Sequence, residues 1–142
     1  MSRLVITGAS ILNQATADIV IDSGKIVEVA KPGAADTFGA RVIDAAGLIA
    51  LPGFVDLHTH LREPGREDAE TVESGTRAAA LGGFTCVHAM ANTEPVADTA
   101  GVVEQVWRLG KEAGWCEVRP IGAVTVGLAG THMAELGAMA AS

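Results

Sequence analysis

Apolar and polar positions follow different patterns in two regions of the chain, which meet near Pro52. From Arg3 to Ala50, short runs of alternating character predict β-strands: LVITG, ADIVID, KIVEVA and RVIDAAGLIAL. The dipeptide Ser23-Gly24 between the second and third runs predicts a hairpin turn, and the composition of Lys31–Ala40 predicts a loop. Residues 1–52 are therefore expected to form a small β domain.

After Pro52 the pattern changes to strand, helix, strand, helix, strand. The segment TVESGTRAAAL predicts a helix that ends at Gly82-Gly83, and a second helix, starting at Asp98 or Thr99, is expected to end at Gly114. This alternation implies parallel strands joined by right-handed crossovers, in a doubly wound α/β sheet or an α/β barrel. The strands are expected to start near Phe54, Phe84 and Val118. Four acidic residues are expected at the start and on the solvated face of the first helix: Glu67, Asp68, Glu70 and Glu73.

Composition excludes some classes of function. The 142 residues suffice for one ordinary domain or for parts of two. Hydrophobic residues make up 49% and aromatic residues 4%, so burial must rest on aliphatic side chains, as it does in helix-covered parallel sheets. The chain has 10 basic and 17 acidic residues and no basic cluster, which argues against nucleic acid or an anionic membrane as a partner.

Cysteine usage and hydropathy bear on the cellular location. Cys86 and Cys116 lie far apart, which is typical of a reducing, cytoplasmic setting and not of a disulfide framework. Both are expected to be small buried hydrophobic residues and not nucleophiles. The first residues lack the apolar core of a signal peptide, and no run approaches the roughly 18 apolar residues of a membrane span. A cytoplasmic protein is expected.

Candidate chemistry concentrates in the segment FVDLHTHLREPG, residues 54–65. Because successive side chains of a strand alternate between its faces, Asp56, His58 and His60 should point the same way. The opposite face is expected to pack against covering helices, and it consists of Val55, Leu57, Thr59 and Leu61.

Polar groups are also expected at the ends of two neighbouring strands. In both α/β architectures, functional groups gather where parallel strands end and the following loops begin. His58, His60 and Arg62 occupy this place after the first strand, and Asn92 occupies it after the strand GFTCVHAM. His88, within that strand, is expected to be a hydrogen-bonded interior residue and not a ligand.

Two histidines at positions i and i+2 of one strand face can both reach one metal ion, and neutral imidazole is a preferred zinc ligand. A bare H-x-H is more often a pair of histidines satisfied by hydrogen bonds. The aspartate before the pair and the arginine after it favour the functional interpretation. Asp56 itself has two equal interpretations, because it could orient an imidazole or satisfy a hydrogen-bond donor in the interior.

These residues carry a family resemblance. The segment GLIALPGFVDLHTHLREPG, residues 47–65, resembles the first barrel strand of the amidohydrolase superfamily, in which D-x-H-x-H closes the strand. The continuation LREPG, followed after one helix by MANTEP at residues 90–95, resembles dihydroorotase of the bacterial type.

The resemblance implies an α/β fold, a (β/α)8 metal-dependent hydrolase barrel preceded by a small β-sandwich domain. Residues 1–52 would be part of a composite β-sandwich, and residues 53–142 would supply only the first three βα units of the barrel. The chain is then expected to be the N-terminal portion of a longer enzyme and inactive alone. The family's general-base aspartate, its bridging metal ligand and two later histidines would lie beyond Ser142.

The activity implied by the resemblance is the reversible cyclisation of N-carbamoyl-L-aspartate to L-dihydroorotate, a step of pyrimidine (UMP) biosynthesis. His58 and His60 match the first two zinc ligands, for one or two zinc ions in each active site. Arg62 and Asn92 match the positions that hold the substrate carboxylate. A guanidinium suits this task because it can grip a carboxylate with two parallel hydrogen bonds.

Two alternatives from other classes stay open. A hydantoinase or allantoinase would keep H-x-H and the barrel but change the substrate grip, and the pair Arg62 and Asn92 argues against it. A non-catalytic dihydroorotase-like subunit could instead scaffold aspartate transcarbamoylase, although it would not need His58 and His60. A homo-oligomer is a further candidate assembly.

Overall fold

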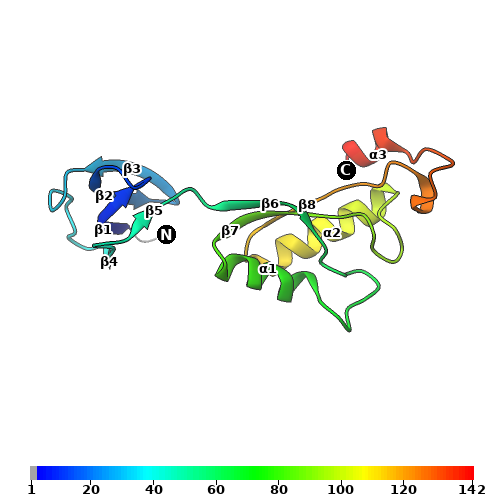
Figure 1. The fold of residues 1–142 in the computed structure, drawn as a ribbon, viewed down its shortest axis with the longest axis horizontal. Coiled ribbons are helices and arrows are strands. Elements are labelled where there is room, and N and C mark those ends of the chain that lie inside the picture. The colour runs from blue at the N-terminus through cyan, green and yellow to red at the C-terminus, as the bar shows by residue number, and fades with distance from the viewer. Residues whose placement is uncertain (1–2) are drawn as a thin grey trace. The chain divides into compact units, whose positions relative to one another are not determined.

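The computed structural model describes residues 3–142, which divide into two compact units at Pro52 (Figure 1). The first unit is one sheet with the strand order β3-β2-β1-β4, in which β5 also pairs with β1. β1 is antiparallel to β2 and parallel to β4 and β5. The strands are β1 (Leu4–Ile11), β2 (Thr16–Asp22), β3 (Lys25–Ala30), β4 (Arg41–Asp44) and β5 (Ile49–Ala50).

The turn between β2 and β3 is the predicted hairpin. Ser23 and Gly24 both have positive φ, at 50° and 76°, which matches the twist that a two-residue hairpin loop requires. The run RVIDAAGLIAL, by contrast, forms two strands and not one. β4 pairs with the first half of β1 and β5 with its end, because a turn closed by the hydrogen bond from Leu48 N–H to the Ala45 carbonyl separates them.

Asp18 anchors the loop Lys31–Ala40 to the first sheet. The residue is only 1% exposed, and its carboxylate accepts backbone hydrogen bonds from Gly8 (3.0 Å), Gly33 (2.8 Å) and Ala35 (3.4 Å). These donors, above all the N–H of Gly8, hold the pKa of Asp18 below its ordinary value. The predicted loop is therefore fixed at its start by a buried carboxylate.

Asp18→Asn should lower the thermal stability of the protein. It should also make that stability change less as the pH falls into the acidic range. An amide has only one acceptor oxygen, so its NH₂ group would face a backbone N–H that the carboxylate now accepts. The folded-state pKa of Asp18 is lowered, so its contribution is present above the ordinary pKa of 3.8 and is lost as the pH falls through the lowered value. Thermal unfolding from neutral to strongly acidic pH measures both effects.

Asp22→Asn is the matched control, because Asp22 is exposed at the end of the same strand and, within residues 3–142, its side chain bonds only the Ser23 hydroxyl, at 3.1 Å. We expect this variant to unfold like the unchanged protein across the pH range. Equal losses in the two variants would contradict the anchoring role of Asp18.

The second unit alternates strands and helices, as the sequence predicts. Its strands form a parallel sheet in the order β6-β7-β8, and a 3₁₀ turn, η1 (Val126–Leu128), precedes its last helix. α2 follows the N-cap Thr99 and ends at Gly114, whose φ of 68° is the left-handed conformation that glycine favours. The elements are β6 (Phe54–Thr59), α1 (Val72–Leu81), β7 (Phe84–Ala89), α2 (Ala100–Ala113), β8 (Glu117–Pro120) and α3 (Leu136–Ala140).

The core of this unit lies between the sheet and its first two helices. α1 packs on β7, α2 packs on β8, and the two helices contact each other. The approach of α2 to β8 requires Gly110, because a Cβ there would lie 2.4 Å from the Cβ of Val118. The buried residues of this cluster are Leu61, Val72, Val87, Ala89, Val106 and Val118.

The expectation for the outward face of the first barrel strand is only partly correct. Leu61 is 3% exposed and packs in the core, but Val55 and Leu57 are 51% and 68% exposed. β6 is an edge strand of the three-stranded sheet, whereas α1 packs on β7 and α2 packs on β8, so no helix among residues 3–142 covers these two side chains. No helix in the same range is both long and apolar enough to span a membrane.

Candidate active site

The polar groups predicted at the strand ends come from two segments that run side by side. Thr59 ends β6, and its carbonyl accepts the Met90 N–H just after β7, at 2.9 Å. Further on, the Pro64 carbonyl accepts the Glu94 N–H at 2.9 Å. His60 and Arg62 lie between these two links on one segment, and Asn92 lies between them on the other. The parallel pairing of β6 with β7 therefore brings the predicted residues to one place.

The two histidines of the H-x-H segment lie close together. Their ring centroids are 5.1 Å apart with an interplanar angle of 65°. His60 Nδ1 lies 2.8 Å from the side-chain oxygen Oδ1 of Asn92, which follows the neighbouring strand. With the amide oxygen facing the ring, this contact is a hydrogen bond in the tautomer that carries the proton on Nδ1, and in that tautomer the Nε2 lone pair is available.

The Asp56 carboxylate bonds a backbone N–H and no imidazole nitrogen within residues 3–142. Its carboxylate accepts the His58 N–H at 2.9 Å, and this bond is the main reason why the pKa of Asp56 lies below its ordinary value. The β6–β7 register shifts between Asp56 and Thr59, so the ladder is irregular where His58 lies. Within residues 3–142 the carboxylate therefore satisfies a backbone donor and does not orient an imidazole.

Arg62 has a positive backbone φ, and its side chain makes no hydrogen bond or ion pair within residues 3–142. Its φ is 62°, and its carbonyl accepts the Arg66 N–H at 2.8 Å. The residues on either side are fixed, since Leu61 is buried in the core and the Glu63 carboxylate accepts the Val72 N–H of α1 at 2.7 Å. The exposed Arg62 guanidinium makes no hydrogen bond or ion pair with residues 3–142, so it is free to receive a ligand.

The Glu63 contact was not expected from the sequence. Nine positions separate Glu63 from Val72, and only the fold places the carboxylate at the first turn of α1. There it accepts one of the N–H groups that a helix start leaves unpaired, in a place where the helix dipole favours negative charge. An acidic residue beside the motif arginine is too weak a signal to have revealed this contact.

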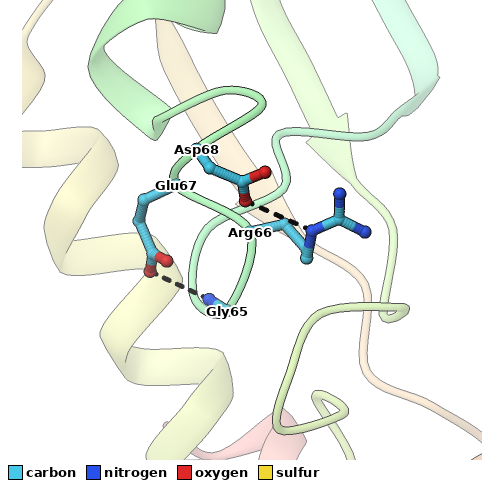
Figure 2. A network of polar contacts seen from close by, with 4 residues as sticks. All are labelled: Gly65, Arg66, Glu67 and Asp68. Atoms are coloured by element: carbon cyan, nitrogen blue, oxygen red, sulfur yellow. Dashed lines mark hydrogen bonds and ion pairs between the residues drawn. The ribbon is translucent and has the colours of Figure 1, made fainter.

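The acidic residues after Arg62 form a turn and not the start of the helix. α1 begins only at Val72, so of the four predicted residues only Glu73 lies in its first turn. Figure 2 shows the turn, in which Glu67 accepts the Gly65 N–H at 2.8 Å and Asp68 lies 3.2 Å from Arg66 Nε. The prediction of a helix start was wrong for Glu67, Asp68 and Glu70 and correct for Glu73, because the capping box of Thr71 and Ser74 starts the helix at Val72, within the segment expected for it.

Gly65 allows this turn to pack against the Asn92 segment. Its φ is +108°, and a Cβ there would lie 2.4 Å from the backbone oxygen of Glu94. A side chain at this position would therefore force apart the two segments that hold Arg62 and Asn92.

Two further expectations concern His88 and Cys86 in β7 and Cys116 just before β8. His88 is half-buried, and its Nδ1 lies 3.3 Å from the Asp56 carbonyl, as expected for a hydrogen-bonded histidine. Cys86 and Cys116 are free thiols, and burial raises the pKa of each. A raised pKa disfavours the thiolate, in agreement with the prediction that neither is a nucleophile.

Solved structures share the fold of this chain. The L-hydantoinase (dihydropyrimidinase) from Arthrobacter aurescens matches 88% of the chain and 28% of its own length, with a TM-score of 0.76 at 22% identity. The D-hydantoinase from Thermus sp. matches 86% of the chain and 28% of its own length, with a TM-score of 0.61 at 28% identity. The chain is therefore an α/β protein whose structural neighbours are barrel proteins of the hydantoinase and amidohydrolase class.

Comparisons of the sequence point to one family within this class of barrel proteins. A family model described as dihydro-orotase-like matches residues 47–142. A protein named dihydroorotase from Streptomyces coelicolor is 63% identical over 139 residues, which cover 98% of this chain and 32% of that protein. A second from Mycobacterium tuberculosis is 57% identical over 122 residues, covering 86% and 28%.

The chain belongs to the dihydroorotase-like family, which confirms the resemblance noted in its sequence. It spans about a third of the length of the curated relatives that it matches.

Proposed function

We propose that the chain supplies one side of the active site of a dihydroorotase, which interconverts N-carbamoyl-L-aspartate and L-dihydroorotate in pyrimidine synthesis. The observation that carries the proposal is the 2.8 Å contact between His60 and Asn92 at neighbouring strand ends. This contact joins a candidate metal ligand, His60, to a candidate substrate-binding residue, Asn92. The membership of the family supports the same conclusion.

The proposal includes a finer description of the two units. The first would be part of a composite β-sandwich, and the second would be the first three βα units of a (β/α)8 barrel. In support, the second unit is parallel throughout and its matched relatives are about three times as long. A cytoplasmic location belongs to the same proposal, and the two free thiols support it.

His58 and His60 would hold zinc. The donor chemistry fits, because the imidazoles lie together and the contact with Asn92 leaves Nε2 of His60 available. Residues 3–142 contain no cluster of three or more His, Cys, Asp or Glu side chains that could bind a metal, so the remaining ligands would come from outside this range. When bound, zinc would activate water and polarise the ring amide carbonyl.

Arg62 and Asn92 would hold the carboxylate of the substrate. The Arg62 guanidinium is exposed and can form two parallel charge-assisted hydrogen bonds to a carboxylate. The fixed neighbours of Arg62 would keep its position constant relative to the histidines. The pair would orient the ring so that its amide carbonyl faces the metal.

The alternatives predict a different use of these residues. Hydantoin carries no carboxylate, so a hydantoinase would have no partner for the Arg62 guanidinium, and allantoin lacks one as well. A subunit that only scaffolds aspartate transcarbamoylase would not need two adjacent imidazoles. Both histidines and the free guanidinium thus favour the dihydroorotase over these two candidates.

An activity comparison tests the proposal. The protein at its full natural length, loaded with zinc, should hydrolyse dihydroorotate with a kcat/KM well above those for hydantoin and allantoin. The assay follows each ring opening separately. Turnover of hydantoin or allantoin in preference to dihydroorotate would assign the chain to that activity. A protein inactive on all three that binds aspartate transcarbamoylase would be the scaffold.

A further inference from the structure

Asn92, a candidate substrate-binding residue, also contacts the candidate metal ligand His60. Its Oδ1 lies 2.8 Å from His60 Nδ1, whereas its Nδ2 makes no hydrogen bond within residues 3–142. The two ends of the amide therefore have different surroundings. One end is engaged with an imidazole, and the other is exposed.

The backbone holds Asn92 opposite His60. The links from Met90 N–H to the Thr59 carbonyl and from Glu94 N–H to the Pro64 carbonyl flank the pair, each at 2.9 Å. On the same side, the Ala97 N–H donates to the carbonyl of the buried Ala91 at 3.0 Å. Backbone hydrogen bonds thus join the two segments on either side of the contact between the two side chains.

This arrangement favours one tautomer of His60. A neutral imidazole carries its proton on one nitrogen, and a metal can bind only the other. Since Oδ1 is an acceptor, it requires the proton on Nδ1 and leaves Nε2 for the metal. A partner that accepts the second imidazole N–H typically raises metal affinity about 10- to 100-fold.

We infer that Asn92 is a positioning residue for the metal site: its Oδ1 fixes His60 in the tautomer that can bind zinc through Nε2, while its Nδ2 is left for the substrate carboxylate. This inference rests on the proposed function. It gives one amide two roles that use opposite ends of the group. Substrate binding and metal binding then depend on the same side chain, and a suitable substitution can separate them.

Asn92→Asp and Asn92→Ala separate the two roles. Aspartate keeps an acceptor for Nδ1–H but repels a carboxylate, so zinc affinity should stay at or above the starting value while the KM for dihydroorotate rises. Alanine removes the acceptor, so zinc affinity should fall about 10- to 100-fold. Competition with a chromophoric chelator measures zinc affinity in the full-length protein without reference to activity. Glu94→Gln, in the same segment but without a side-chain hydrogen bond among residues 3–142, is the matched control and should leave zinc affinity unchanged.

The tautomer itself provides a test that needs no variant. In the metal-free protein, two-bond ¹H–¹⁵N correlation spectra should show the proton of neutral His60 on Nδ1, also in Asn92→Asp, and a loss of this preference in Asn92→Ala. The position of the proton on the neutral ring is not changed simply by the negative charge that aspartate adds, whereas zinc affinity is sensitive to that charge. A proton on Nε2 in the unchanged protein would overturn the inference.

Other outcomes separate this inference from the proposed function. If Asn92→Ala binds zinc as tightly as the unchanged protein while His60→Ala loses zinc, the positioning role fails and the metal site stands. Equal losses of zinc in Asn92→Asp and Asn92→Ala would also contradict the role of the acceptor. If His60→Ala keeps stoichiometric zinc, the proposed metal site fails.

Discussion

Replacing His60 with alanine should remove bound zinc and abolish turnover in the full-length protein, and His58→Ala should do the same. In the proposed site each substitution would remove one imidazole from the same ion, and a site without one of its few ligands cannot hold zinc in the required geometry. The closeness of the two rings, 5.1 Å between centroids, is the reason to expect equal effects from both variants. Elemental analysis after dialysis and an assay of dihydroorotate hydrolysis measure the two losses.

His132→Ala is the matched control for this experiment. His132 is exposed, and its ring nitrogen Nδ1 lies 3.2 Å from the hydroxyl of the adjacent Thr131, so it has no contact with the site. This variant should keep both zinc and activity. Stoichiometric zinc in both His58→Ala and His60→Ala would show that the two histidines are not the ligands.

Local patterns were sufficient to predict most elements of the chain. The hairpin at Ser23-Gly24, the end of α2 at Gly114 and the start of β7 at Phe84 each depend on a few neighbouring residues. Glycine's access to positive φ fixes such boundaries without reference to the rest of the fold. The parallel pairing of β6, β7 and β8 follows from the same alternation of strands and helices.

Expectations failed where a distant segment decides the outcome. Val55 and Leu57 have the alternation of a buried face, but their burial depends on which helices cover β6. The run after Arg41 forms two strands because each pairs with a different part of β1. The placement of Glu67, Asp68 and Glu70 at a helix start failed for a local reason instead, because the capping box of Thr71 and Ser74 starts α1 at Val72.

The candidate site could be predicted as a set of residues but not as a set of contacts. Strand alternation placed His58 and His60 together, and strand ends placed Asn92 near them. The bond between His60 and Asn92 depends on the register of β6 with β7, and the contact of Glu63 with Val72 depends on the path of the chain into α1. Such long-range geometry has no local signature in a single sequence.

Arg62→Lys should reduce kcat/KM for dihydroorotate roughly ten- to a hundred-fold, about 1.4 to 2.8 kcal/mol of transition-state stabilisation, with zinc retained. Lysine keeps the positive charge but loses the planar pair of donors that matches a carboxylate. Arg62→Lys is a sharper test than Arg62→Gly. The φ of Arg62 is 62°, so glycine would relax the backbone in addition to removing the side chain. The side chain makes no hydrogen bond or ion pair with residues 3–142, so the change should not alter stability.

The matched control for Arg62→Lys is Arg66→Lys, four residues further along the same segment. Arg66 is exposed and lies 3.2 Å from Asp68, a surface pair whose contribution to stability is small. This variant should retain the full kcat/KM if the effect at Arg62 comes from a specific grip on the substrate. Equal losses in both variants would indicate a general effect of positive charge near the site. Unchanged kinetics in Arg62→Lys would make Arg62 a solvated surface residue and leave the substrate carboxylate to another group.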